Sequence, residues 1–253
     1  MKALPSKIFS ISLSVIAVFV IAGCSRYYQA ESVQYQQVNI QPQLNKDSAL
    51  VQLLAPYADQ VNRQMSVVIG EVAVPLEKKL PESTLGNLMA DAMRSSAEKT
   101  YNEKVDMAFI NYGGIRINQV QPGPLTLHLV FEMMPFDNQL VVQKLPGSIV
   151  QQFLDTVASR GGWPGSGITY SIRQKKATEI FVGGLALDPG KIYVVANSDY
   201  VVNGGDNCIM LKNFPQENKG YLVRDALIEY FKSLSAKGEK ISAQLENRVK
   251  YAD

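Results

Sequence analysis

Asn111-Tyr112-Gly113-Gly114-Ile115-Arg116 directly follows a short apolar segment, 107–111, which the sequence predicts to be a β-strand. Paired glycines let backbone amides approach a ligand closely. Arg116 adds a planar, permanently charged guanidinium that suits phosphate or hydroxyl oxygens. Taken alone, such a loop is more often a tight turn than a binding site, so its assignment as a binding loop depends on other segments of the sequence.

A second glycine pair occurs in Asn203-Gly204-Gly205-Asp206, which follows another predicted strand. An ionised aspartate at this position can accept two hydrogen bonds from a vicinal diol. Phe136 and Tyr200 are aromatic residues on the predicted loops 134–138 and 198–207. Either one alone is more simply explained by core packing, but together they suit a flat ring lying between them.

Strands and helices alternate irregularly along the rest of the chain, which favours the α+β class over a regular βαβ arrangement. Asp47 or Ser48 can cap the first predicted helix, and Pro56 should bend that helix or mark its first turn. Apolar periodicity predicts helices over 47–65, after 84, after 146 and over 221–234, and strands over 67–74, 107–111, 125–131, 140–144, 168–173, 178–182, 191–197 and near Arg248.

The N-terminal residues predict export. Lys2 and Lys7 precede an apolar run over 8–22 that is too short to span a bilayer comfortably. The run ends in Ile21-Ala22-Gly23-Cys24, which resembles the lipobox of bacterial lipoproteins, where the cysteine is lipidated and becomes the new N-terminus. The alternative, a membrane anchor helix, is disfavoured because a polar segment follows Gly23 at once.

We therefore expect a signal peptide over 1–23, a polar, glutamine-rich tether over 24–46 and a lipid anchor on Cys24. Ser25 resembles the sorting pattern of outer-membrane rather than inner-membrane lipoproteins. The expected localisation is an exported bacterial lipoprotein, anchored in the outer membrane and facing the periplasm or the surface.

Composition limits the class of ligand. Without residues 1–23 the chain carries 23 Lys and Arg against 23 Asp and Glu, so it is formally neutral. Neutrality argues against nucleic-acid binding, although a small nucleotide needs only one or two local charges. About 200 residues after the tether suffice for one domain, here 47–253. If Cys24 carries lipid, Cys208 has no partner, and the fold must hold without disulfides.

Four motifs occur in the order and approximate spacing found in the C-terminal domain of 5′-nucleotidases and UDP-sugar hydrolases, which this sequence resembles. They are Thr84-Leu-Gly-Asn-Leu88, Asn111-x-Gly-Gly-Ile-Arg116, Pro135-Phe-x-Asn138 and Asn203-Gly-Gly-Asp206. Each motif is weak alone, but four in order make coincidence improbable. The resemblance covers roughly residues 45–250 and implies layered mixed sheets flanked by helices, with 47–65 as the linker helix that precedes the domain.

The resemblance also implies a nucleoside-binding site. Phe136 and Tyr200 would enclose the base, and Asp206 would bind the ribose hydroxyls. Lys79 stands where the family often has an arginine, and lysine keeps the charge but loses the bidentate fork. The predicted substrate-binding residues are Lys79, Asn111, Gly113, Gly114, Arg116, Phe136, Asn138, Tyr200, Gly205 and Asp206. The sequence departs from the family pattern at Tyr112, Asn207 and Cys208.

We do not expect this sequence to contain the metal centre that catalyses hydrolysis in the family. The family cleaves phosphate esters with a two-metal centre in its N-terminal domain, which needs several histidines together with carboxylates. This sequence has one histidine, His128, in a strand-like segment. No two-metal centre, Ser–His–Asp triad or zinc site can be built from it, so we assign no catalytic residue and no metal ligand.

Three functions remain open. The first is the substrate-holding subunit of a split nucleotide phosphohydrolase, whose divalent metal pair lies on a separate metallophosphoesterase chain docked near helix 47–65. The second is a nucleoside-binding surface lipoprotein with no catalytic role. The third is a structural or surface-interaction protein that only keeps the fold.

Overall fold

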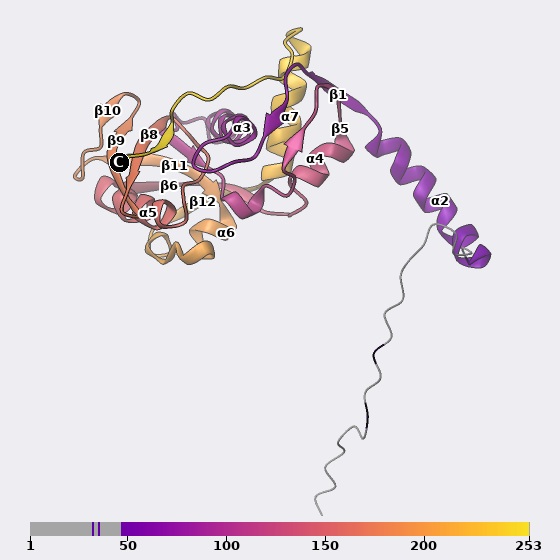
Figure 1. Cartoon of the computed structure of the whole chain (residues 1–253), viewed down its shortest axis with the longest axis horizontal. Helices are drawn as coiled ribbons and strands as arrows, with labels where there is room; N and C mark the ends of the chain where they lie inside the picture. Colours follow the sequence, from indigo (N-terminus) through magenta and orange to yellow (C-terminus); the bar gives the residue numbers. More distant parts are fainter. Residues whose placement is uncertain (1–31, 33–34, 36–46, 253) are drawn as a thin grey trace, which may run out of the picture. The chain divides into compact units, whose positions relative to one another are not determined.

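The computed structural model describes Ser32, Tyr35 and residues 47–252. The predicted signal peptide, Cys24 and nearly all of the predicted tether lie outside these residues. The chain divides into two units, residues 1–51 and residues 52–253, and the second, called the compact unit below, is described by itself (Figure 1).

The first helix, α2 (Ser48–Met65), begins where the sequence predicted. Asp47 caps it, because its Oδ1 accepts hydrogen bonds from the backbone nitrogens of Ala49 at 2.9 Å and Leu50 at 3.1 Å. Pro56 lies in the interior of the helix rather than in its first turn. No residue of α2 is buried, and an apolar stripe of exposed side chains runs along it, formed by Leu50, Leu54, Tyr57 and Val61.

A mixed five-stranded sheet forms the centre of the compact unit, with the strand order β12-β6-β11-β3-β7. β11 runs parallel to β3, and the other neighbouring pairs are antiparallel. The strands are β3 (Met107–Phe109), β6 (Gln139–Pro146), β7 (Gly165–Ser166), β11 (Ile192–Ser198) and β12 (Gln216–Leu222).

Successive side chains of a strand point to opposite faces of a sheet, and each face of this sheet packs against its own hydrophobic core. Leu140 of β6 packs in a core with α3 (Thr84–Tyr101) and α7 (Val223–Ala236), which lie side by side. Leu145 of the same strand packs in a second core with α5 (Gly147–Ser159). Strands covered on both sides read as continuous apolar runs, which explains why β6 and β11 were predictable from sequence.

A second sheet covers α5 from the other side. Its strand order is β10-β9-β8-β13, and α5 contacts both β9 and β6, so the helix lies between the two sheets. The strands are β8 (Ile168–Arg173), β9 (Lys176–Val182), β10 (Leu185–Ala186) and β13 (Val249–Tyr251). The layered α+β architecture predicted from the sequence is therefore confirmed (Figure 1).

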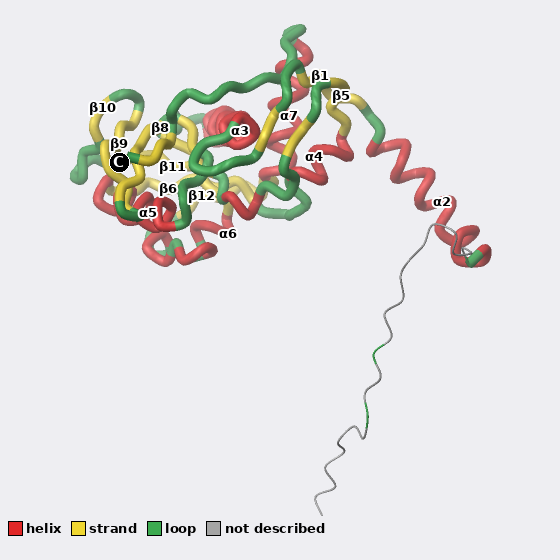
Figure 2. Tube along the Cα trace, in the orientation of Figure 1, coloured by secondary structure: helices red, strands yellow, loops and turns green. Residues whose placement is uncertain are grey.

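The prediction of a strand over 125–131 is wrong, because most of this segment is helical. Strand β5 (Gly123–Thr126) ends at Thr126, whose hydroxyl accepts a hydrogen bond from Leu129 N at 3.3 Å and caps helix α4 (Leu127–Met133) (Figure 2). Alternating apolar residues fit a strand or a helix equally well over so short a window. His128 therefore lies on an exposed helix surface, with its Nε2 3.4 Å from Glu132 Oε1.

The other differences between the predicted and the observed secondary structure concern short helices and strands. The predicted loop 198–207 contains helix α6 (Asp199–Val202) and a 3₁₀ turn over Gly205–Asn207. β5 pairs with β1 (Val68–Val72), which is shorter than the predicted strand 67–74. The predicted loop 75–84 contributes β2 (Leu76–Glu77) to a small sheet with β4 (Gln119–Val120).

Two kinds of feature are absent from the described residues. Among them, no helix combines the length and apolarity needed to cross a bilayer. Likewise, across 47–252, no three His, Cys, Asp or Glu side chains lie close enough together to hold a metal ion.

Candidate binding site

The chain topology brings three loops to one edge of the central sheet. Because β3 and β11 are parallel, both end at the same edge, and the antiparallel β6 begins there. Asn111 follows β3, Tyr200 follows β11, and Asn138 directly precedes β6. Ligands of mixed α/β folds commonly bind beyond the carboxyl ends of strands, and this edge has that character.

A pocket of about 330 Å³ opens at this edge. Its volume lies at the lower end of the range of about 300–1,000 Å³ that is typical of small-molecule sites. Eight of the ten residues predicted from sequence line it, and Lys79 and Gly205 do not. That any of these ten residues binds a ligand stays a prediction. The lining residues are Asn111, Gly113, Gly114, Arg116, Phe136, Asn138, Tyr200 and Asp206.

Asp206 is held in place by two side chains. Asn111, which is 7% exposed, donates a hydrogen bond from Nδ2 to Asp206 Oδ2 at 2.9 Å. On the other side, Arg160 Nη1 lies 3.7 Å from Asp206 Oδ1. A carboxylate has about four acceptor positions on its two oxygens, so these contacts leave positions free for a ligand. The backbone of Asp206 is left-handed, with φ of 51°, which turns the residue out of the regular 3₁₀ turn.

The two glycines at the β3 end have different roles. A Cβ on Gly114 would lie 2.6 Å from Asn111 Oδ1, whereas one on Gly113 would meet only Asn111 Nδ2 at 3.9 Å. The first distance is a collision and the second is an ordinary contact. Gly114 therefore makes room for the Asn111 amide that binds Asp206, whereas a side chain at Gly113 would meet no neighbour closer than van der Waals contact.

For the nucleoside that the family resemblance implies as ligand, Gly114→Ala is expected to displace the Asn111 amide and raise the Kd about tenfold, since it breaks a charge-assisted hydrogen bond worth roughly 1.5–3 kcal/mol. Gly113→Ala is the matched control and should change the Kd about threefold or less. Isothermal titration calorimetry on both variants measures this difference. Equal losses in the two variants would mean that both glycines serve ligand approach instead.

Phe136 and Tyr200 are two large aromatic side chains left partly exposed in one pocket, with 39% and 46% of their surface accessible. The Arg116 guanidinium lies over the Phe136 ring, 5.6 Å from its centroid, and donates a long hydrogen bond to Gly113 O at 3.4 Å. Exposed aromatic surface is unfavourable in water, so a pocket with two such rings is suited to a flat apolar ligand.

Gly205, which was predicted as a ligand-binding residue, packs against Tyr200 instead of lining the pocket. A Cβ on Gly205 would lie 2.5 Å from both Tyr200 O and Tyr200 Cε1. The absence of a side chain here allows the turn that carries Asp206 to lie directly against Tyr200. Gly205 therefore sets the spacing between the Tyr200 ring and Asp206.

Lys79 does not line the pocket, because its ammonium forms an exposed ion pair with Glu77. The neighbouring Lys78 contacts the Arg116 loop, donating to Ile115 O at 2.7 Å and lying 4.1 Å from the Tyr112 ring centroid. Partial burial, and then the nearby charge of Arg116, lower the pKa of Lys78. Lys78 does not line the pocket either, so the assignment of Lys79 to the binding site stays a prediction.

A pair of variants separates the two lysines. For the ligands that the family resemblance implies, Lys78→Ala is expected to weaken binding of a nucleoside monophosphate about fivefold while leaving the nucleoside nearly unaffected, because one partly screened charge contributes about 1 kcal/mol. Lys79→Ala should change either affinity less than about twofold. If Lys79→Ala has the larger effect on the monophosphate, the assignment from family resemblance is correct and Lys78 serves only the loop.

Comparison with known proteins identifies similar chains. A family model described as "5′-nucleotidase, C-terminal domain" matches residues 68–213. The 5′-nucleotidase of Vibrio vulnificus (strain CMCP6) is 28% identical over 79% of this chain and 37% of its own length. Protein UshA of Escherichia coli (strain K12) is 24% identical over 81% of this chain and 38% of its own length.

A crystal structure described as a 5′-nucleotidase precursor from Thermus thermophilus superposes with a TM-score of 0.71 and 28% identity. The match covers 80% of this chain and 43% of that protein. The chain thus spans about two fifths of the length of the relatives it matches.

Proposed function

This chain belongs to the family of 5′-nucleotidase C-terminal domains, and we propose that it binds a nucleoside or nucleotide in the pocket between Phe136 and Tyr200. One observation carries the proposal. Two partly exposed aromatic rings and the carboxylate of Asp206 line the same pocket, although they come from two segments more than 60 residues apart in the chain, the Phe136 loop and the segment after β11.

Each group has a distinct task in the proposed complex. The base lies between the rings of Phe136 and Tyr200, where stacking contributes about 1–3 kcal/mol per base. The ribose hydroxyls donate to Asp206 in charge-assisted hydrogen bonds of about 1.5–3 kcal/mol each. Arg116 faces the phosphate end. Ordering the ligand and the loops costs several kcal/mol, so we expect micromolar to millimolar affinity.

We further propose that the hydrolytic chemistry is supplied by another chain. A two-metal phosphoesterase centre needs several histidines with carboxylates, and this sequence has a single histidine, His128. Its side chain is 64% exposed on α4, outside the pocket. A divalent metal pair would therefore be held by a separate metallophosphoesterase chain acting on the nucleotide that this domain holds.

Helix α2 is the proposed docking element for that chain. It carries an apolar stripe at spacings of four, three and four residues, and each of these side chains is at least half exposed. Burying such a stripe against a partner contributes roughly 25 cal/mol per Å² of apolar surface. The stripe comprises Leu50, Leu54, Tyr57 and Val61.

The predicted lipid anchor places the chain at a membrane surface. Cys24 lies outside the described residues, so this part of the proposal rests on the sequence alone. Mass spectrometry of the chain purified from membranes tests it: a diacylglyceryl-modified N-terminal Cys24 is expected, and Cys24→Ala should release the chain from the membrane fraction. An unmodified chain that still begins at Met1 would contradict the proposal.

Calorimetry with adenosine, uridine and their monophosphates tests the binding proposal directly. At least one of them should bind in the expected range, and Phe136→Ala should weaken that binding about tenfold or more through loss of one stacking face. Absence of both heat and thermal shift with all four ligands would contradict nucleotide binding.

Reconstitution tests the split enzyme. The purified chain is mixed with an exported metallophosphoesterase encoded beside it, and hydrolysis of nucleoside monophosphates is expected only when both are present. Leu54→Glu with Val61→Glu should abolish co-purification and activity, whereas Gln52→Glu with Gln60→Glu adds the same charge outside the apolar stripe and should not. If the chain binds nucleosides but neither associates nor activates, it is a nucleoside-binding lipoprotein with no catalytic role.

A further inference from the structure

We propose that Arg224 is a positioning residue that fixes Phe136 as a wall of the pocket, an inference that rests on the proposed binding function. Arg224 lies at the start of α7 and does not line the pocket. Its side chain is only 10% exposed, and the guanidinium lies over the Phe131 ring, 4.3 Å from the centroid.

The hydrogen bonds of Arg224 all go to the loop that carries Phe136. Nη1 donates to Met134 O at 3.4 Å and to Phe136 O at 3.2 Å, while Nη2 donates to Asp137 Oδ1 at 2.7 Å. These contacts span three of the four residues between α4 and Asn138. The exposed tip of this loop, 135–137, is thereby bonded to a buried cation.

Two further contacts complete the support of this loop. The backbone nitrogen of Val223, adjacent to Arg224, donates to Asn138 O at 2.8 Å. On the far side, Asp199 Oδ1 accepts from both Gln139 N at 2.9 Å and Tyr200 N at 2.8 Å. The Phe136 loop is thus bonded to α7 along 134–138 and tied to the Tyr200 turn where it enters β6.

Burial makes the position of Arg224 informative. Removing a guanidinium from water is costly unless its donors are satisfied, and among the described residues Arg224 Nε has no hydrogen-bond partner. A hydrophobic residue would fill the same space beneath Phe131 without this cost. The donors that are satisfied all serve the Phe136 loop, so the geometry points to placement of this loop as the function of the charge.

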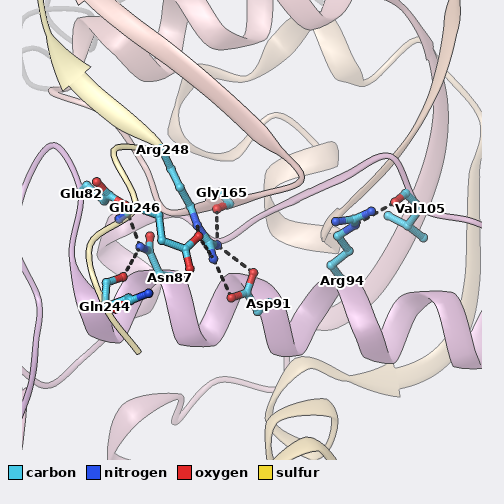
Figure 3. Close-up of polar contacts among 9 residues, drawn as sticks. All are labelled: Glu82, Asn87, Asp91, Arg94, Val105, Gly165, Gln244, Glu246 and Arg248. Carbon is cyan, nitrogen blue, oxygen red and sulfur yellow. Dashed lines mark hydrogen bonds and ion pairs between the residues drawn. The ribbon is translucent and has the colours of Figure 1, made fainter. Parts of the chain in front are cut away.

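Arg248 is a matched control for Arg224, because it is also a buried arginine but its contacts lie outside the pocket lining. Its side chain is 11% exposed, and it binds Asp91 through two hydrogen bonds of 2.7 and 2.8 Å and Gly165 O at 3.0 Å. Figure 3 shows this cluster on α3, with Glu246 completing it. None of these residues lines the pocket between Phe136 and Tyr200, so Arg248, which holds the C-terminal segment onto α3, is a control outside that pocket.

Binding measurements on matched variants test the proposal. Arg224→Met is expected to raise the nucleoside Kd about tenfold, because the stacking face loses its fixed position. Arg248→Met should lower the melting temperature at least as much but change the Kd less than about twofold. Arg224→Lys, which keeps the charge without the fork, should give an intermediate Kd. Equal Kd changes for Arg224→Met and Arg248→Met would overturn the proposal.

A fluorescence measurement needs no ligand and therefore separates this inference from the proposed function. Phe136→Trp introduces an indole at the pocket wall, while the single native tryptophan, Trp163, is buried at 2% exposure. Adding Arg224→Met should increase acrylamide quenching and shift the emission to the red, whereas adding Arg248→Met should not. Unchanged quenching with Arg224→Met overturns the positioning role even if nucleosides bind.

The remaining outcomes are also decisive. Increased quenching together with an absence of nucleoside binding by the unmodified chain would support the positioning of Phe136 and refute the proposed function. If Arg224→Met does not fold, Arg224→Lys carries both measurements, and an unchanged Kd with unchanged quenching for this variant overturns the inference.

Discussion

Asp206→Ala is expected to raise the Kd for a ribonucleoside about 100-fold or more. The carboxylate is the group proposed to accept the ribose hydroxyls, and two charge-assisted hydrogen bonds together contribute at least about 3 kcal/mol. The loss is enlarged because Asn111 Nδ2 and Arg160 Nη1, which contact the carboxylate at 2.9 and 3.7 Å, lose their partner. The pocket then presents donors where it presented an acceptor.

Calorimetry with a ribonucleoside and its 2′-deoxy form measures this prediction and assigns its cause. The unmodified chain should prefer the ribonucleoside, and Asp206→Ala should abolish the preference. Asp188→Ala, at an exposed turn remote from the pocket lining, is the control and should leave both affinities unchanged. A persisting preference for the ribonucleoside in Asp206→Ala would assign the hydroxyl contact to another group.

The lining of the candidate pocket was largely predictable from sequence, because these residues belong to loops whose order along the chain is distinctive, whereas their roles in binding stay predictions. The sequence could not show why these loops meet. That depends on the parallel pairing of β11 with β3 and the antiparallel pairing of β11 with β6, which brings segments about 90 residues apart to one sheet edge. Motif order identified the family, and the topology supplies the physical reason.

The features that sequence reasoning missed share one cause: their partners are distant in the chain or carry no periodic signal. β12 consists mainly of exposed polar residues at a sheet edge, so it has no apolar alternation to detect. Arg224 contacts carbonyls about 90 residues earlier, and no spacing rule indicates such a contact. Helix α4 was mistaken for a strand because seven residues are too few to fix a period.

Gly205→Ala is expected to impair both the fold and the binding site, although it adds a single methyl group. The new Cβ would lie 2.5 Å from Tyr200 O and 2.5 Å from a ring carbon of the same residue. The ring is 46% exposed and can rotate away, but the carbonyl belongs to a short helix whose first turn is fixed by Asp199 and Ser198. Relief therefore requires the Gly205–Asn207 turn to move, and this turn carries Asp206.

Such a forced shift costs about 1–3 kcal/mol of folding stability, which corresponds to a fall in melting temperature of several degrees for a domain of this size. The nucleoside Kd should rise by roughly 30-fold or more, since the aromatic wall and the acidic residue both move. Gly190→Ala is the matched control, because its Cβ would meet only Asp188 Oδ1 at 3.5 Å. Thermal unfolding and calorimetry on the two variants check both effects. A Gly205→Ala variant that melts lower yet binds normally would show that the pocket tolerates movement of this turn, and that Asp206 does not depend on Tyr200 for its position.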